Sequence, residues 1–448
     1  MTFRGPYADG PSPEDLLVDS PPLRGLKPRD VGRLIVIATV MGVSIGTAIL
    51  RVRDKKATAV WGGVVTGFER LGPTFVKLGQ LIASSPGIFP KPLADAALRC
   101  LDEVPPIDPA AAVAVIREDL GDPGEIFKSF DETPLSAASI GQVHACVLLD
   151  GREAVVKIQR PGIRDRMARD LRLAHLLSRF AERISKAARL TKPTAIIEDL
   201  HAVTFQELNS ALEAHRQHQF RENLHKFGDN RQVTAPEIYW DHCGPRVICM
   251  ERMYGTPFDE SDTLRERGMD GPDMLRHGVK AWAEACLIHG LFHGDVHAGN
   301  LWVLDDGRTC YLDFGIMGEI TPEWQQLLRD FFYTAMFDLD FTRIVRGYRR
   351  LGIIPEHVGT EAEIAMRMNL IFGPLLRTGL KNVSLGKTIV MLFDMAKQFE
   401  AETPRELVLV SKQLIYFERY SKALAPDWVL FTDRKLVTNI FPGAEDAA

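Results

Sequence analysis

The pattern of hydrophobic and polar residues along the chain predicts a short β-rich region within a largely helical protein. Residues 143–149 and 154–158 are apolar runs on either side of the turn dipeptide Asp150-Gly151, which is typical of a β-hairpin. Residues 163–226 and most residues beyond 272 follow helical spacing.

Residues 34–50 form a run of 17 residues without a charge between Arg33 and Arg51. As a helix, this run would be about 25 Å long, slightly shorter than the roughly 30 Å hydrocarbon core of a bilayer. Ala38, Gly42 and Gly46 put small residues on one helix face, where a second copy of the helix could approach in a homodimer. Two interpretations stay open: a membrane span, and an apolar helix packed on the protein or lying at an interface.

The positive charges that flank this run indicate on which side of a membrane the following domain would lie. The cluster that follows contains Arg51, Arg53, Lys55 and Lys56, which favours a cytoplasmic position for the next domain. Basic residues before the run weaken that argument. We expect a cytoplasmic catalytic domain at the cytoplasmic face of a membrane, anchored or peripheral.

Composition narrows the class of protein. The 448 residues carry 54 Lys and Arg against 59 Asp and Glu, a formal net charge of −5, which argues against a general nucleic-acid binder. The six cysteines include no CxxC pair, so we expect no zinc knuckle or disulfide scaffold and a reducing compartment. Residues 1–33 begin with a stretch rich in Pro, Gly, Asp and Ser, which predicts a flexible tail.

The strongest chemical signal is Phe292-His-Gly-Asp-Val-His-Ala-Gly-Asn-Leu followed by Leu312-Asp-Phe-Gly. Asn300 lies five positions after Asp295, and Asp313 lies thirteen after Asn300, which is the spacing of the protein-kinase signature. In phosphoryl transfer, Asp295 would orient the attacking hydroxyl or water. Asn300 and Asp313 would supply the hard oxygen ligands that Mg²⁺ requires.

An alternative use of the same segment is a transition-metal site. His293, Asp295 and His297 alternate along the chain and would project to one side of an extended segment. No distant His or Glu with a recognisable motif completes such a site, but the geometry leaves this alternative open.

Lys157 lies inside an apolar strand pattern, Ala154-Val-Val-Lys-Ile, where an unpaired ammonium would be costly to bury. Such a lysine reaches the α- and β-phosphates in kinases, and Glu207 and Glu213 are both candidate partners. The preceding strand should carry a phosphate-covering loop. The sequence there is Pro134-Leu-Ser-Ala-Ala-Ser-Ile-Gly-Gln-Val-His, which lacks the glycine-rich pattern.

Together these residues resemble the UbiB/AarF family of atypical kinase-like proteins over roughly residues 65–430. Lys77-Leu-Gly79-Gln80 looks like the family's K-x-G-Q motif, whose helix lies across the cleft and obstructs protein substrates. The family's E-x-D motif falls on Glu207-Leu-Asn209. Asn209 replaces the acid of that motif.

The resemblance also implies roles for individual residues. Glu213 would pair with Lys157. Residues 293–300, called the catalytic segment below, depart from the family's pattern at Gly294, Val296 and Ala298. The catalytic set would be Asp295, Lys157, Glu213, Lys77 and Gln80. Nucleotide would contact Ser136, Ala137, Ala138, Ser139, Lys157, Glu251 and Met253, the last two in the adenine hinge.

The fold implied by the resemblance is α+β and protein-kinase-like, with a β-rich N-lobe, a helical C-lobe and a helical extension over the cleft. The expected segments are a tail (1–33), a membrane helix with its basic flank (34–57), the extension (58–119), the N-lobe (120–255) and the C-lobe (256–448).

The function implied by the resemblance is binding of ATP and Mg²⁺ with ATPase activity, supporting isoprenoid quinone or membrane lipid metabolism. A lipid or quinone precursor would be a further ligand. Two alternatives remain: a protein or small-molecule kinase, and a non-catalytic scaffold switched by nucleotide.

Overall fold

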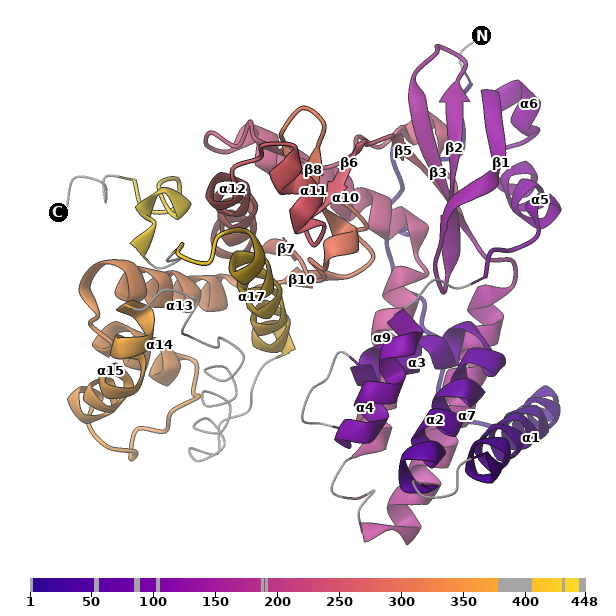
Figure 1. The fold of residues 1–448 in the computed structure, drawn as a ribbon, viewed down its shortest axis with the longest axis horizontal. Helices are drawn as coiled ribbons and strands as arrows, with labels where there is room; N and C mark the ends of the chain where they lie inside the picture. The colour runs from indigo at the N-terminus through magenta and orange to yellow at the C-terminus, as the bar shows by residue number, and fades with distance from the viewer. Residues whose placement is uncertain are drawn as a thin grey trace. The chain divides into compact units, whose positions relative to one another are not determined.

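The computed structural model describes residues 3–51, 56–83, 89–101, 105–186, 189, 192–377, 405–428 and 432–442. The chain divides into two compact units (Figure 1). Unit 1 comprises Met1–His215 and Ile238–Arg252, and unit 2 comprises Arg216–Glu237 and Met253–Ala448. The segment boundaries expected from the sequence stay predictions, and each unit is described by itself below.

Unit 1 contains a four-stranded antiparallel sheet in the order β1-β2-β3-β5 (Figure 1). Its strands are β1 (Phe127–Ala137), β2 (Gly141–Leu148), β3 (Glu153–Gln159) and β5 (Val247–Glu251). The predicted β2–β3 hairpin is confirmed. Gly151 at its turn has φ +92°, a conformation that side-chain-bearing residues rarely adopt.

The described helices of unit 1 are α1 (Pro28–Leu50), α2 (Lys56–Leu71), α3 (Pro73–Ala83), α4 (Lys91–Ala97), α5 (Pro109–Asp119), α6 (Pro123–Ile126), α7 (Ile163–Ile184), α9 (Pro193–Glu207) and the start of α10 (Ser210–Lys226). Helices α5 and α6 lie beside the sheet, and most other helices of unit 1 gather at one end of it (Figure 1). Val115 and Ile116 of α5 pack with Val156 of β3 in the core of the sheet. A second core joins Phe75 of α3 to Leu173 of α7, so the helical extension packs on α7.

Helix α1 is long and apolar enough to cross a membrane, and only 11% of its most hydrophobic window is buried. Two ion pairs nevertheless hold its start against α7. Asp30 accepts from Arg172 at 2.9 Å, and Arg33 donates to Asp170 at 2.7 Å, with both carboxylates 1% exposed. Further along, α1 packs on α2, where a Cβ at Gly63 would lie 2.7 Å from the Ile45 Cα. Helix α1 therefore packs against α7 and α2 as part of unit 1.

The flexible tail predicted for residues 1–33 is wrong for the described part of that segment. Tyr7 is 7% exposed and lies in the core of the sheet. Gly5 N donates to Asp241 O at 2.8 Å, and the Asn209 side chain donates to the carbonyl of Asp15 at 2.9 Å. Composition predicted disorder, but unit 1 supplies partners for the segment's backbone groups, and helix α1 already begins at Pro28.

Unit 2 holds two small sheets. The four-stranded sheet has the order β4-β9-β8-β6, and the two-stranded sheet pairs β10 with β7. The strands are β4 (Val233–Thr234), β6 (Gly255–Pro257), β7 (Leu291–His293), β8 (Leu301–Leu304), β9 (Thr309–Tyr311) and β10 (Met317–Glu319). The short β7–β10 ladder, with His293 opposite Met317, positions the segments that carry the kinase-like motifs.

Helices make up most of unit 2 and share one hydrophobic core. Besides the end of α10, they are α11 (Ser261–Glu266), α12 (Gly271–Glu284), α13 (Pro322–Tyr333), α14 (Thr342–Arg350), α15 (Glu361–Arg377) and α17 (Arg405–Leu424). Trp282 of α12, Phe292 of β7 and Phe417 of α17 are each at most 1% exposed in this core. The Trp282 and Phe417 rings meet with centroids 5.6 Å apart, so α17 packs directly behind the catalytic segment.

Candidate active site

Lys157 lies in the middle of the sheet of unit 1 and forms an ion pair with Glu213. On β3, Lys157 is opposite Val143 of β2 and Ile248 of β5. Its Nζ lies 2.5 Å from Glu213 Oε1 of α10, with the side chains 13% and 4% exposed. Glu213, one of the two partners that the sequence left open, binds Lys157. The pair neutralises an ammonium that would be costly to bury alone.

Glu207, the other candidate, binds Lys77 of the K-x-G-Q motif. The Lys77 Nζ contacts Glu207 Oε2, and the two side chains are 12% and 8% exposed. Gly79 is fixed by packing, because a Cβ there would lie 2.4 Å from the Cys100 Sγ. Gln80, three residues after Lys77 on α3, is half-buried. The motif thus combines one ion pair with one close helix approach.

A small pocket joins the residues around these ion pairs. It lies within unit 1 between the end of the β1–β2 loop, strand β3 and the start of α10. Its lining includes Ile140, Gly141, Lys157, Glu207, Ser210 and Glu213. Unit 1 therefore gathers the strand lysine and both glutamates at one place.

The loop predicted to cover phosphates is a tight turn after β1. Ser136 and Ala137 end β1 opposite Val143 and Gln142, and Ala138 N donates to Gly141 O at 2.8 Å to close the turn. Ser139 within it is buried. Gly141 is required here, because a Cβ would lie 2.6 Å from the Ile158 carbonyl oxygen.

Arg160 and Gln142 hold this loop, and sequence reasoning missed both. Arg160 donates to Ala138 O at 3.0 Å and to Pro105 O at 2.7 Å. Gln142 Oε1 accepts from Ile107 N at 2.9 Å. The loop is thereby tied to the segment before α5. The only sequence signal for Arg160 is its position directly after β3.

The expected adenine hinge follows β5. Glu251 ends that strand opposite Ala154, and Met253 lies just beyond the division between the two units. The contacts of both residues with adenine stay predictions.

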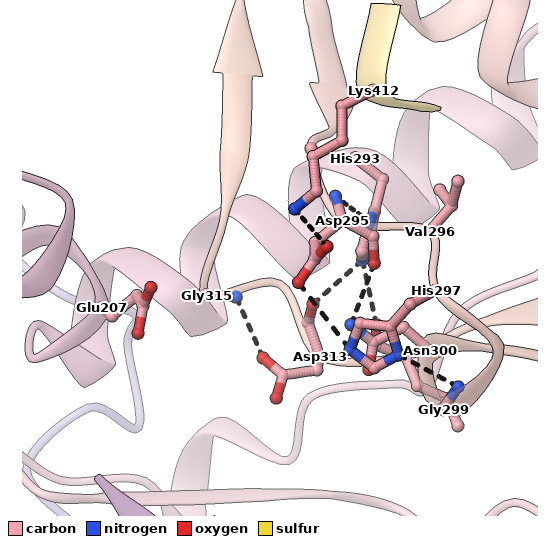
Figure 2. Close-up of polar contacts among 12 residues, drawn as sticks. Glu207, His293, Asp295, Val296, His297, Gly299, Asn300, Asp313, Gly315 and Lys412 are labelled. Atoms are coloured by element: carbon pink, nitrogen blue, oxygen red, sulfur yellow. Dashed lines mark hydrogen bonds and ion pairs between the residues drawn. The ribbon is translucent and has the colours of Figure 1, made fainter. Parts of the chain in front are cut away.

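In unit 2, His293 links the two kinase-like motifs (Figure 2). Its Nε2 lies 2.9 Å from both Leu312 O and Asp313 O, and its Nδ1 accepts from Asp295 N at 3.2 Å. These partners require a neutral ring with its proton on Nε2. Complete burial, which lowers the pKa of His293, favours that neutral form.

The same contacts bear on the transition-metal alternative. Both ring nitrogens of His293 are directed at backbone groups, so this ring does not present a free nitrogen to a metal. The described residues also contain no group of three His, Cys, Asp or Glu side chains arranged to hold an ion. The geometry of the segment does not favour a site built on His293, Asp295 and His297.

The Asp295 carboxylate is held by a lysine from a distant helix. Lys412 Nζ of α17 lies 2.8 Å from Asp295 Oδ1, and His297 Nε2 lies 3.7 Å from Oδ2 (Figure 2). Burial by itself raises the pKa of Asp295. The neighbouring Lys412 and His297 outweigh burial, and the net pKa is below its usual value. Asp295 is therefore an ionised carboxylate.

Asn300 and Asp313 lie beside Asp295 in the order that the motif predicted. Asn300 Nδ2 donates to the Asp295 carbonyl at 3.0 Å, and Leu312 N donates to the Asn300 carbonyl at 2.8 Å. Asp313 has φ +52°, a left-handed conformation that is strained for a residue with a side chain. Its Oδ1 accepts from Gly315 N at 3.2 Å (Figure 2).

These two side chains fit Mg²⁺ by their donor chemistry. The amide nitrogen of Asn300 donates to the Asp295 carbonyl. The amide oxygen on the other side of the group can therefore serve as a metal ligand. Asp313 contributes a carboxylate, the type of oxygen that hard divalent cations prefer. The buried Phe314 anchors the strained backbone next to Asp313, with its ring centroid 5.1 Å from that of His293.

Helix α17 forms hydrogen bonds with main-chain atoms of the catalytic segment. Gln413 Oε1 accepts from Val296 N at 2.8 Å, and its Nε2 donates to Gly294 O at 2.6 Å. Tyr420 donates through its hydroxyl to Val296 O at 2.9 Å. Gly294 and Val296, the departures from the family segment, are thus held through main-chain atoms, which every residue type supplies.

Sequence reasoning missed Lys412, Gln413 and Tyr420. The signal was present in the helical spacing of α17: Val410, Gln413, Phe417 and Tyr420 form one buried stripe. A glutamine at a core position of a helix needs hydrogen-bond partners. The pattern does not say which segment supplies them.

Comparison with known proteins identifies relatives over most of the chain. Residues 99–347 match the ABC1 atypical kinase-like domain, and residues 368–429 match the UbiB helical domain. An uncharacterized protein of Mycobacterium tuberculosis (strain H37Rv) is 38% identical over 375 residues, covering 82% of this chain and 75% of that protein.

Two further relatives agree with these matches. A probable protein kinase UbiB of Pseudomonas putida (strain F1) is 36% identical over 374 residues, covering 82% of this chain and 68% of the relative. A Mycobacterium tuberculosis protein solved in complex with erythromycin shares the fold, with a TM-score of 0.50 and 24% identity over 79% of this chain and 91% of that one. The α+β kinase-like fold expected from the sequence is confirmed. The chain belongs to the ABC1/UbiB family of atypical kinase-like proteins.

Proposed function

We propose that this chain binds ATP with Mg²⁺ and hydrolyses it, in support of isoprenoid quinone or membrane lipid metabolism. The observation that carries this proposal is the arrangement in unit 2. Asp295 is an ionised carboxylate fixed by α17, and Asn300 and Asp313 present oxygen ligands next to it. This is the set of groups that phosphoryl transfer needs.

Bound Mg²⁺ would neutralise charge on the phosphate oxygens, held by Asn300 and Asp313. The chain's own residues would do the rest. Asp295 accepts a hydrogen bond from the attacking water and points its oxygen at the terminal phosphorus. The water oxygen bonds to that phosphorus as the bond to the bridging oxygen breaks. ADP leaves with the bridging oxygen, and the proton of the water passes by way of Asp295 to solvent.

In unit 1, Lys157 would bind nucleotide phosphates while Glu213 fixes its direction. Their 2.5 Å contact supports this role, because a strand lysine paired with a helix glutamate is the arrangement that kinases use. The turn closed by Ala138 and Gly141 would cover the phosphates with backbone groups.

The test is MgATP binding and turnover by the full chain. We expect a thermal shift with MgATP that Asp313→Asn abolishes, since the variant loses the carboxylate ligand. Asp306→Asn is the matched control, because Asp306 is a carboxylate of the β8–β9 turn that pairs with Arg308. An undiminished shift in Asp313→Asn would refute the metal assignment.

Turnover should then be measured with and without liposomes and a small phenol that mimics a quinone precursor. Stimulation by either supports an ATPase coupled to lipid. Transfer of the terminal phosphate to a defined acceptor, lost in Asp295→Asn, would instead establish a kinase. Tight MgATP binding with no turnover would indicate a nucleotide-switched scaffold.

We also propose that α1 attaches the protein to a membrane while lying along its surface. The buried ion pairs of Asp30 and Arg33 with α7 support this geometry, since they hold α1 on unit 1. Ile35, Val36 and Val43 remain exposed on its outer side.

The matching experiment is flotation with liposomes. Replacing Ile35, Val36 and Val43 together by Gln should release the protein from the lipid fraction. Gln at Met366 and Leu370, exposed apolar residues of α15, is the control. Retention of the triple variant would place the attachment elsewhere.

A further inference from the structure

Lys412 places a positive charge at the catalytic carboxylate from 117 positions away in the chain. Its Nζ is 2.8 Å from Asp295 Oδ1, and its side chain remains 29% exposed. The Lys412 side chain is therefore partly exposed, whereas that of its carboxylate partner is only 18% exposed. The cation lies against the group that would orient the attacking oxygen.

We propose that Lys412 is a further active-site residue, whose ammonium holds the Asp295 carboxylate and binds an oxygen of the terminal phosphoryl group of the nucleotide. The inference rests on the proposed function and adds to it the residue that would distinguish ATP from ADP.

The distances around Asp295 indicate where the phosphoryl group would lie relative to Lys412. An attacking oxygen must lie within hydrogen-bond distance of its base, about 2.6–3.2 Å, and about 3–3.5 Å from the atom that it attacks. Lys412 Nζ is within hydrogen-bond distance of the same carboxylate. A phosphoryl group placed for attack next to Asp295 would then have its oxygens within reach of this ammonium.

The position of Lys412 is built into the fold. The next residue, Gln413, is bound to both Gly294 and Val296 of the catalytic segment and is fully buried. Tyr420, two turns further along α17, donates to Val296 as well. These contacts fix the Lys412 backbone against the segment that carries Asp295, so the approach of the two charges follows from how α17 is docked.

Charge also favours the assignment. The predicted metal ligand Asp313 and the carboxylate of Asp295 are both acidic, and the transferring phosphoryl carries negative charge as well. Cations that bind phosphoryl oxygens stabilise that charge as it develops. In unit 1, the lysines of the two motifs, Lys77 and Lys157, each bind a glutamate. Within the described part of unit 2, Lys412 is the lysine that contacts the catalytic motif.

The experiment is equilibrium binding of MgADP and of a magnesium complex of a non-hydrolysable ATP analogue. We expect Lys412→Met to weaken the analogue about 10- to 100-fold, the range for losing one hydrogen bond to a charged group. Affinity for MgADP should stay within a factor of two or so of the original. Turnover should fall through kcat by about 100-fold, as for removal of a group that stabilises developing charge.

Two more variants separate charge from mere support of Asp295. Lys412→Gln keeps an N–H donor toward Asp295 but lacks the charge, and we expect it to lose discrimination as Met does. Lys412→Arg keeps the charge, and we expect it to retain most of the preference for the ATP analogue. If Gln restores discrimination and turnover, Lys412 only supports Asp295 and the proposal is wrong.

Lys422→Met is the matched control. Lys422 lies on the same helix, ten residues further along, and forms an ion pair of 2.5 Å with Glu418. It should change neither affinity. Melting temperature measured on every variant identifies any that fail to fold, and Lys412→Gln remains a test if Lys412→Met is unstable.

The outcomes also separate this proposal from the proposed function. A wild-type chain without affinity for either nucleotide would overturn the proposed function itself, and the inference with it. A wild-type chain that prefers the ATP analogue, with a Lys412→Met variant that has the same preference, would overturn only the role of Lys412.

Discussion

The candidate functional residues of unit 1 and those of unit 2 are stabilised in different ways. In unit 1, each motif lysine binds a glutamate: Lys157 binds Glu213, and Lys77 binds Glu207. In unit 2, the motif residues are oriented by backbone groups and by α17, with Asp295 held by Lys412 and the segment around it by Gln413. Removing a motif lysine from unit 1 therefore leaves a buried charge, and removing Lys412 does the same at Asp295. Removing Gln413 instead misdirects the backbone next to Asp295.

The largest expected effect is in unit 1. Lys157→Met leaves the Glu213 carboxylate, 4% exposed, without its cation. The free energy of unfolding should fall by about 3–5 kcal/mol, as for a broken buried ion pair. Chemical denaturation measures it.

The double variant Lys157→Met with Glu213→Leu sharpens this prediction. Removing both charges should recover most of the stability but not MgATP binding. A double variant as unstable as the single one would show that the pair is not what limits stability there.

In unit 2, Gln413→Leu should affect turnover more than stability. The Val296 N–H and the Gly294 carbonyl both lose their side-chain partner. The free energy of unfolding should fall by about 1–3 kcal/mol in all, and the loosened segment should lower kcat with little change in MgATP affinity.

Gln326→Leu on α13 is the control for that variant, because Gln326 donates to the Asp330 side chain. Equal loss of MgATP affinity and kcat in Gln413→Leu would contradict the view that Gln413 only directs the catalytic segment.

Acidification should weaken unit 1 through His144. Gln142 donates to its Nε2 and its Nδ1 lies 2.8 Å from Asp131 O, so the folded ring is neutral, and burial lowers the pKa of His144. The unfolded ring takes up a proton below about pH 6.5. This contribution to stability is present above that pH and is lost as the pH falls below it, at no more than about 1.4 kcal/mol per pH unit.

Denaturation between pH 7.5 and 5.5 tests this, and His144→Gln should show a shallower decrease than the wild-type chain. Parallel curves would assign the acid sensitivity to other groups.

The smallest effect is expected for Asn209→Asp, which restores the acid of the E-x-D motif. Asn209 Nδ2 donates to Asp15 O and Leu17 O, and its Oδ1 caps α10 by accepting from Leu212 N. Aspartate keeps the cap but has no donor, so stability should fall by about 0.5–1.5 kcal/mol. Residues 3–27 should become more sensitive to proteolysis. Unchanged proteolysis would show that Asn209 does not hold this segment.

The local sequence pattern was sufficient to predict the features that depend on residues close together in the chain. The hairpin around Gly151 was predictable from β-rich runs and a turn dipeptide, and the spacing of Asp295, Asn300 and Asp313 indicated kinase-like chemistry. The same reasoning was wrong for the first residues, because composition does not record that Tyr7 is buried in the core of the sheet.

The sequence by itself determined the motif residues, the apolar character of α1 and the likeness to a family. Only the tertiary structure decided that Lys157 binds Glu213 while Glu207 binds Lys77, and that Lys412 and Gln413 contact residues 294–296. The physical reason is distance along the chain. Which buried charge meets which partner depends on how helices such as α10 and α17 pack, and that packing is set by side chains 56 and 117 positions apart.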